Sequence, residues 1–165
     1  MSQRPMRRKD RQLPQEEAWA LLEEGGHGVL SVTGDGGWPY GVPMNFITLD
    51  GCLYLHCARE GHKLDSIARD DRVCFTVVTK AQPVPEHITT LYESVIVFGR
   101  ASLVEEEDQR LAVLDQLISD LGQVSPALKA RYIQAKQAKT GLIRIQPVQV
   151  TGKASRNYVP VEKRM

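Results

Sequence analysis

Hydrophobic and polar residues alternate with a period of two along much of the chain, which is the pattern of half-buried β-strands. The alternation predicts strands over residues 28–33, 38–49, 52–57, 73–79, 93–104 and 141–150. The glycine-rich residues 34–37 and the Asp50-Gly51 pair predict hairpin turns between the first three strands. Residues 80–90 hold Pro83 and Pro85 and predict a loop or a sheet edge.

Apolar residues three and four apart predict helices over residues 14–24, 61–70, 108–121 and 126–138. Ser125-Pro126 supplies a cap and a first-turn proline for the last of these. The strands are not separated by regular helices, which argues against a doubly wound sheet. We therefore predict a mainly β protein with short helices, built as a six- to seven-stranded closed antiparallel barrel.

The length of 165 residues favours one domain. We place this domain at residues 13–153, between a flexible basic arm at 1–12 and a C-terminal tail at 154–165. The last predicted strand ends at residue 150, and the residues from 151 onward are read as a polar tail. The arm is expected to be a solvated terminus, although its arginines are also compatible with docking onto a polyanion.

Composition narrows the class of protein. With 21 basic against 20 acidic residues, the near-neutral charge argues against a nucleic-acid binder. No apolar run approaches the roughly 18 residues of a membrane span, and no signal peptide is evident. The three cysteines lack C-x-x-C spacing, so neither a disulfide framework nor a metal site is predicted. We expect a soluble, cytoplasmic protein.

The segment 56–64 carries the densest cluster of chemistry-bearing side chains. It runs from a strand end through a glycine turn into a helix, whose free N–H groups and dipole favour a phosphate. Alternation places His56 on the outer face, away from the barrel interior. His56 or His62 could also be an axial haem ligand. Cys57 is not predicted to pair with His56, because neighbouring strand residues point to opposite faces; Cys57 and Cys74 are expected to be small core residues.

A second segment, residues 39–46, combines two prolines and a glycine within a predicted strand. Such a strand is expected at an edge or a distortion, where backbone groups are not used by the sheet. These groups could hydrogen-bond a flat heteroaromatic ligand, or the segment could be a barrel corner without a ligand.

Five segments in order carry a resemblance to a known family. They are G-x-W-P-Y-x-V-P-x-N-F at 36–46, L-Y-L-H-C-A-x-x-G-H-K-L-D at 53–65, V-C-F-T-V-V at 73–78, Y-E-S-V-I-V-F-G-R-A at 92–101 and V-T-G-K at 150–153. Together they resemble the pyridoxamine 5′-phosphate oxidase-like superfamily, and within it the nitroimidazole-resistance branch. The resemblance covers residues 7–153.

The resemblance implies a split β-barrel that binds FMN, as a homodimer with the flavin at the subunit interface. At matching positions, the isoalloxazine edge would be lined by Val42, Pro43, Met44 and Asn45, and the ring and ribityl chain by His56, Cys57 and Ala58. The phosphate would be held by His62 and Lys63. Ser94 and Lys153, from the last two matching segments, would approach the cofactor.

The branch also implies a flavin-dependent oxidoreductase that reduces nitro-compounds or related small electron acceptors, with His56 near the ring as the tentative catalytic residue. No residue is evident as an obligatory acid or base. The alternative is a non-catalytic flavin- or haem-binding protein that acts as a carrier, sensor or store. The C-terminal arginine and histidine pattern that clamps pyridoxal phosphate is missing, and Arg156-Asn157-Tyr158 echoes it only faintly, which argues against vitamin B6 oxidation.

Overall fold

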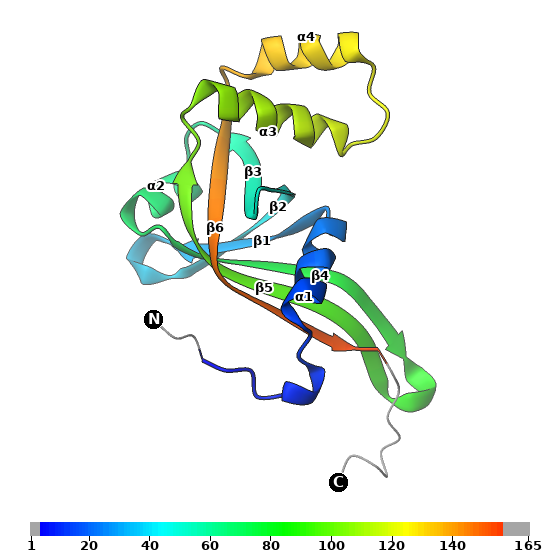
Figure 1. Cartoon of the computed structure of the whole chain (residues 1–165). Coiled ribbons are helices and arrows are strands. Elements are labelled where there is room, and N and C mark those ends of the chain that lie inside the picture. The colour runs from blue at the N-terminus through cyan, green and yellow to red at the C-terminus, as the bar shows by residue number, and fades with distance from the viewer. Residues whose placement is uncertain (1–3, 157–165) are drawn as a thin grey trace.

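The computed structural model describes residues 4–156 and shows a closed six-stranded barrel (Figure 1). The strands are β1 His27–Thr33, β2 Pro39–Leu49, β3 Cys52–Ala58, β4 Arg72–Val84, β5 Thr89–Leu103 and β6 Thr140–Ser155. They follow one another around the ring in the order β1-β2-β3-β6-β5-β4, and each neighbouring pair is antiparallel. The predicted mainly β, split-barrel fold is confirmed.

The barrel interior is filled by one side of each strand, as the alternation predicted. Side chains from five strands have no exposed surface, namely Leu30, Leu53, Leu55, Phe75, Val95, Val97, Ile143 and Ile145. The helix α1, Gln15–Glu24, adds Ala18, Leu21 and Leu22 to this core. It lies against the small residues of β6, where a Cβ on Gly152 would come within 2.6 Å of the Ala18 Cβ.

The other helices lie outside the barrel. Besides the 3₁₀ turns Lys9–Arg11, Asp35–Gly37 and Pro85–His87, they are α2 His62–Arg69, α3 Glu107–Ser119 and α4 Pro126–Lys136. Figure 1 shows α3 and α4 side by side as a hairpin above β2, β3 and β6. Arg110 fixes the base of this hairpin, because its guanidinium donates to the carbonyls of Val104, Gln137 and Thr140 at 2.7–2.9 Å.

The helix α3 creates a second apolar cluster on the outside of the barrel. Val113 and Leu114 of α3 pack with Cys52 and Tyr54 of β3 and with Leu142 of β6, all at most 4% exposed. The outward positions of β3 are therefore not uniformly exposed. His56, two residues beyond Tyr54, is exposed as predicted, because α3 does not cover that end of the strand.

Of the two alternatives predicted for residues 80–90, a loop or a sheet edge, residues 80–84 form the edge, and the predicted polar tail begins as strand. β4 continues through residues 80–84, where it pairs with β5 but not with β1. Because only one side of this stretch is hydrogen-bonded to a neighbouring strand, the missing N–H of Pro83 is tolerated there. β6 continues through the polar residues 151–155, because only the small Gly152 and Ala154 face inward there. The predicted polar tail thus begins later than residue 151.

The N-terminal segment contacts the barrel where it is described. Gln12 forms a bridge with Lys153, and Arg11 donates to the Tyr92 hydroxyl at 3.0 Å. The ends of the predicted arm and tail, residues 1–3 and 157–165, lie outside the described residues. Within residues 4–156, no helix has both the length and the apolar character needed to cross a membrane.

Candidate functional site

The site is built around the point where β2 and β3 separate. β2 pairs with β3 only from Phe46 to Leu49, whereas its first half, from Pro39 to Asn45, pairs with β1 alone. On the β3 side, the backbone groups of residues 39–45 are therefore not used by the sheet. The prediction of an edge in this segment is confirmed.

The end of β3 forms the opposite wall of this separation. His56, Cys57 and Ala58 pair with β6 on one side and have no β2 partner on the other. His56 and Ala58 are exposed, whereas Cys57 points toward the barrel core. Burial raises the pKa of the Cys57 thiol, which the nearby charge of Lys63 offsets only in part. A protonated, half-buried thiol is a poor nucleophile.

The helix α2 begins four residues after β3. The N–H groups of Leu64 and Asp65 both donate to the Gly61 carbonyl, so those of His62 and Lys63 have no partner within the helix. Gly61 has a φ of 124°, a conformation that glycine adopts at low cost and that lets the chain turn into the helix. The first turn of α2 thus offers free donors and the Lys63 ammonium at the end of β3.

His62 has a different environment from the one expected of a phosphate ligand. Its ring stacks on Tyr40 with centroids 4.3 Å apart, and its Nε2 accepts the Asp35 backbone N–H at 3.3 Å. The Asp35 carboxylate in turn pairs with Arg69 at 2.7 Å, and this hydrogen bond lowers the pKa of Asp35. His62 therefore ties α2 to the β1–β2 turn, which leaves only its Nδ1 edge for a ligand.

Ser94 and Lys153 lie far along the sheet from the predicted residues of β3. They are direct cross-strand partners on β5 and β6. His56 pairs with Leu142 near the start of β6, and from there to Lys153 the chain runs about 36 Å of strand at the usual rise per residue. Along β6, the predicted residues of β3 and the Ser94–Lys153 pair therefore lie near opposite ends of the strand.

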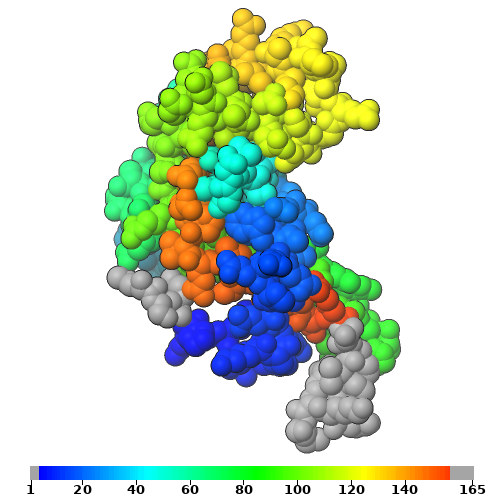
Figure 2. All heavy atoms as spheres, viewed as in Figure 1, coloured from blue at the N-terminus to red at the C-terminus, as the bar shows by residue number. Residues whose placement is uncertain are grey.

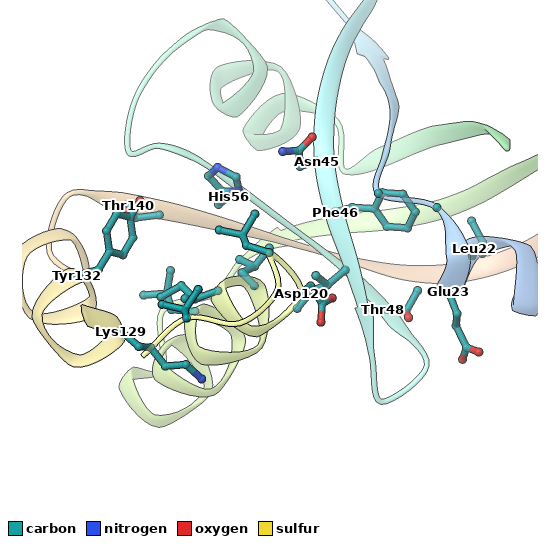
Figure 3. Close-up of a pocket in the computed structure, with 18 of the residues that line it drawn as sticks. Leu22, Glu23, Asn45, Phe46, Thr48, His56, Asp120, Lys129, Tyr132 and Thr140 are labelled. Atoms are coloured by element: carbon teal, nitrogen blue, oxygen red, sulfur yellow. The ribbon is translucent and has the colours of Figure 1, made fainter. Parts of the chain in front are cut away.

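A cavity of about 660 Å³ opens beside the β2–β3 separation, below the α3–α4 hairpin. Figure 3 shows His56, Thr140 and Tyr132 near one another, with Leu22 and Glu23 of α1 at the other side of the cavity. Figure 2 shows the hairpin as a block above the β2, β3 and α1 atoms. Asn45 and His56 therefore border both the strand separation and the cavity.

Sequence reasoning did not identify the helical side of this cavity. Its apolar lining comes largely from the hairpin: Leu114, Leu117, Ile118, Leu121, Val124 and Leu128. The one signal available in the sequence was that the hairpin segment holds more leucines than one buried helix face can accommodate. In the structure, Leu121 and Leu128 are 77% and 57% exposed. Within the described residues, no group of three or more His, Cys, Asp or Glu side chains is placed to hold a metal ion.

The fold and the site together define a class: a split barrel with an open strand edge, a cationic helix start beside it and an adjoining apolar cavity. The pyridoxamine 5′-phosphate oxidase family model matches residues 14–154. The chain belongs to this family, as the sequence resemblance indicated. No curated protein matches the chain in sequence.

Solved structures share the fold. A candidate 5-nitroimidazole antibiotic resistance protein from Bacteroides thetaiotaomicron is 24% identical with a TM-score of 0.74, over 87% of this chain and 86% of that one. An FAD-binding protein from Mesorhizobium loti is 25% identical with a TM-score of 0.66, over 88% and 97%. An FAD- and haem-binding protein from Mycobacterium smegmatis is 16% identical with a TM-score of 0.72, over 93% and 78%.

Proposed function

We propose that this protein is a homodimeric, cytoplasmic FMN-dependent oxidoreductase that reduces nitro-compounds or related small electron acceptors. One observation carries the proposal: the free edge of β2, the unpaired end of β3 and the cationic start of α2 meet at one place in the fold. FAD-binding proteins of the same fold support a flavin as the cofactor. The three free thiols fit a reducing compartment.

The residues present fit FMN. The backbone groups of Val42 to Asn45 would bind the polar edge of the ring, and the unused N–H groups of α2 with Lys63 would hold the phosphate. When bound, FMN supplies the electron transfer, which the protein's side chains do not. His56 is exposed at the cavity end, where it can hold a proton for an acceptor.

A second copy would complete the site. A row of outward-facing residues crosses the sheet directly, from Val29 through Thr76 and Ile96 to Thr151, and the next row is Val78, Ser94 and Lys153. We call these two rows the four-strand face. Val29, Val78 and Ile96 are 38%, 55% and 38% exposed in one chain. An apolar surface of this kind, with Ser94 and Lys153 on it, supports a cofactor at a subunit interface.

The phosphate assignment is tested on the as-isolated, full-length protein by FMN titration. We expect Lys63→Ala to weaken FMN binding about 10–100-fold, because a charge-assisted hydrogen bond is lost. His62→Ala should weaken it less, since the His62 ring is held by Tyr40 and Asp35. Lys136→Ala, which removes an exposed lysine of α4, is the matched control. Unchanged FMN affinity in a Lys63→Ala, His62→Ala double variant would contradict the assignment.

The alternative is a non-catalytic flavin or haem binder. It is favoured by His56, which lines the cavity, and by the flavin- and haem-binding relative of the same fold. The absorbance spectrum of the isolated protein separates the cofactors, since haem gives a Soret band. NAD(P)H-dependent turnover of a nitro-compound or quinone, well above that of free FMN, would exclude the non-catalytic alternative. His56→Ala should then lower that turnover.

A further inference from the structure

We infer that the cavity below the α3–α4 hairpin binds the body of a neutral, largely apolar molecule of drug size, with its polar end against Asn45 and His56. The inference deepens the proposed function, on which it rests for the role of that polar end, by naming the substrate class. It concerns the hairpin side of the cavity, which neither the flavin assignment nor the dimer assignment uses.

Size and lining fit a small organic ligand. A volume of about 660 Å³ lies within the roughly 300–1,000 Å³ of ligand pockets, which are mostly apolar with a few polar groups. Leu117, Ile118 and Leu128 line the cavity from the hairpin, and Phe46 and Ile47 line it from β2. An acceptor the size of a single small ring would leave most of this surface uncovered.

The exposed apolar residues indicate that this surface is built for contact. Leu121, Leu128 and Tyr132 are 77%, 57% and 49% exposed, although all three line the cavity. No residue of the helix α4 is fully buried, and its Ile133 packs half-buried against the apolar cluster under α3. Covering such side chains with an apolar ligand removes their surface from water, which favours binding.

The hairpin is nevertheless held in place at its base. Besides Arg110, Arg59 of the β3–α2 turn donates to the Ala138 carbonyl at 2.9 Å. Lys129 of α4 bonds to α3 through the Asp115 carboxylate at 2.7 Å and the Ser119 hydroxyl at 2.8 Å. The cavity is therefore preformed, which reduces the ordering cost of binding.

Charge decides which molecules enter. The acidic residues Glu23, Glu24 and Asp120 line the cavity, and its only lining lysine among residues 4–156, Lys129, is already paired with Asp115. The Glu23 and Asp120 carboxylates accept hydrogen bonds from the neutral side chains of Trp19 and Gln116, so their charge is not offset. An anionic ligand would meet net negative charge while losing its hydration, so the lining selects against acids. At the polar end, Asn45, His56 and Thr140 supply hydrogen-bonding groups that suit a carbonyl or nitro oxygen.

The test is titration of the FMN-supplemented full chain with Nile red, a neutral apolar dye. We expect saturable binding of one dye per chain. Leu128→Glu should weaken it at least tenfold, because a carboxylate then faces the cavity. Ala130→Glu adds the same charge at an exposed position of α4 that does not line the cavity, and should change binding less than twofold. Leu121→Glu serves as the second cavity variant if Leu128→Glu does not fold.

A matched pair of competitors tests the charge selection. We expect 1-decanol to displace the dye and decanoate, of equal chain length, to fail at the same concentration. Equal dye binding by wild type, Leu128→Glu and Leu121→Glu would overturn the inference. So would a change from dimer to monomer caused by Leu128→Glu, since a second copy would then cover the cavity.

Flavin absorbance, recorded on the same samples, separates the two proposals. Loss of dye binding with flavin retained in Leu128→Glu supports the cavity inference. Wild-type protein that takes up no FMN but binds the dye with the expected variant pattern would contradict the proposed function and leave the cavity assignment supported.

Discussion

Two outer faces of the same barrel differ in how exposed their outward side chains are. On β3 and β6, the outward side chains of Cys52, Tyr54 and Leu142 are at most 2% exposed, because α3 packs on them. We call this the helix-covered face. On the four-strand face, the outward Val78 and Ile96 remain 55% and 38% exposed, and none of the described helices belongs to an apolar cluster with them.

The same strand pattern therefore occurs both on a face that is covered within the chain and on a face that is left open. Along either face, outward residues alternate with a buried inner set, so the local signal is the same. The helix-covered face is completed within the chain and contributes to its own stability. The four-strand face, which carries Ser94 and Lys153, is left open within the chain, and in the proposed homodimer a second copy would cover it.

The largest effect is expected on the helix-covered face. Leu142→Ala should lower the free energy of unfolding by about 2–5 kcal/mol, because it removes buried methyl groups and leaves a cavity under α3. Urea denaturation followed by circular dichroism measures this. Leu103→Ala, at a position that is 44% exposed, should cost well under half as much. Equal costs would erase the contrast between covered and open surfaces.

The next effect is expected on the four-strand face. Ile96→Glu should raise the dimer dissociation constant at least 100-fold, about 2.8 kcal/mol, because a symmetric interface would bury two unpaired carboxylates. Light scattering after size-exclusion chromatography gives the mass, and flavin retention should fall with it. Thr90→Glu, at an exposed position of the same strand, is the control. A wild-type monomer, or an Ile96→Glu dimer, would refute the assignment.

The smallest effect concerns the ion pairs at the end of the four-strand face, where Arg72 of β4 lies directly opposite Arg100 of β5 in the strand register. A hydrogen bond from Arg72 lowers the pKa of Asp70 to about 2. A carboxyl whose pKa is lower in the folded than in the unfolded state stabilises the fold above about pH 4. That contribution disappears as the pH falls toward 2.

Asp70→Asn should therefore reduce the midpoint temperature slightly at pH 7 and not at pH 2, as differential scanning fluorimetry across this range can show. Asp108→Asn, at an exposed position of α3, provides the comparison on the other side of the molecule. A difference between wild type and Asp70→Asn that grows as the pH falls would have the wrong sign.

Much of the site could be predicted from local sequence. The period of two placed His56 outward, the prolines of residues 39–46 marked an open edge, and the glycine turn before α2 marked free N–H donors. Each of these features depends on a few neighbouring residues and on backbone chemistry, so no distant contact was needed to infer it.

Alternation and turn chemistry act over short stretches, so the strands, the barrel class and the chemistry-bearing segments 39–46 and 56–64 could be inferred from the sequence, while the individual cofactor residues within them came from the family resemblance. The sequence pattern did not reveal that α3 covers Tyr54, that His62 is held by Asp35, or that Lys153 lies far along β6 from His56. These outcomes depend on contacts between residues distant in the chain, and so does the cavity that the hairpin forms over β2.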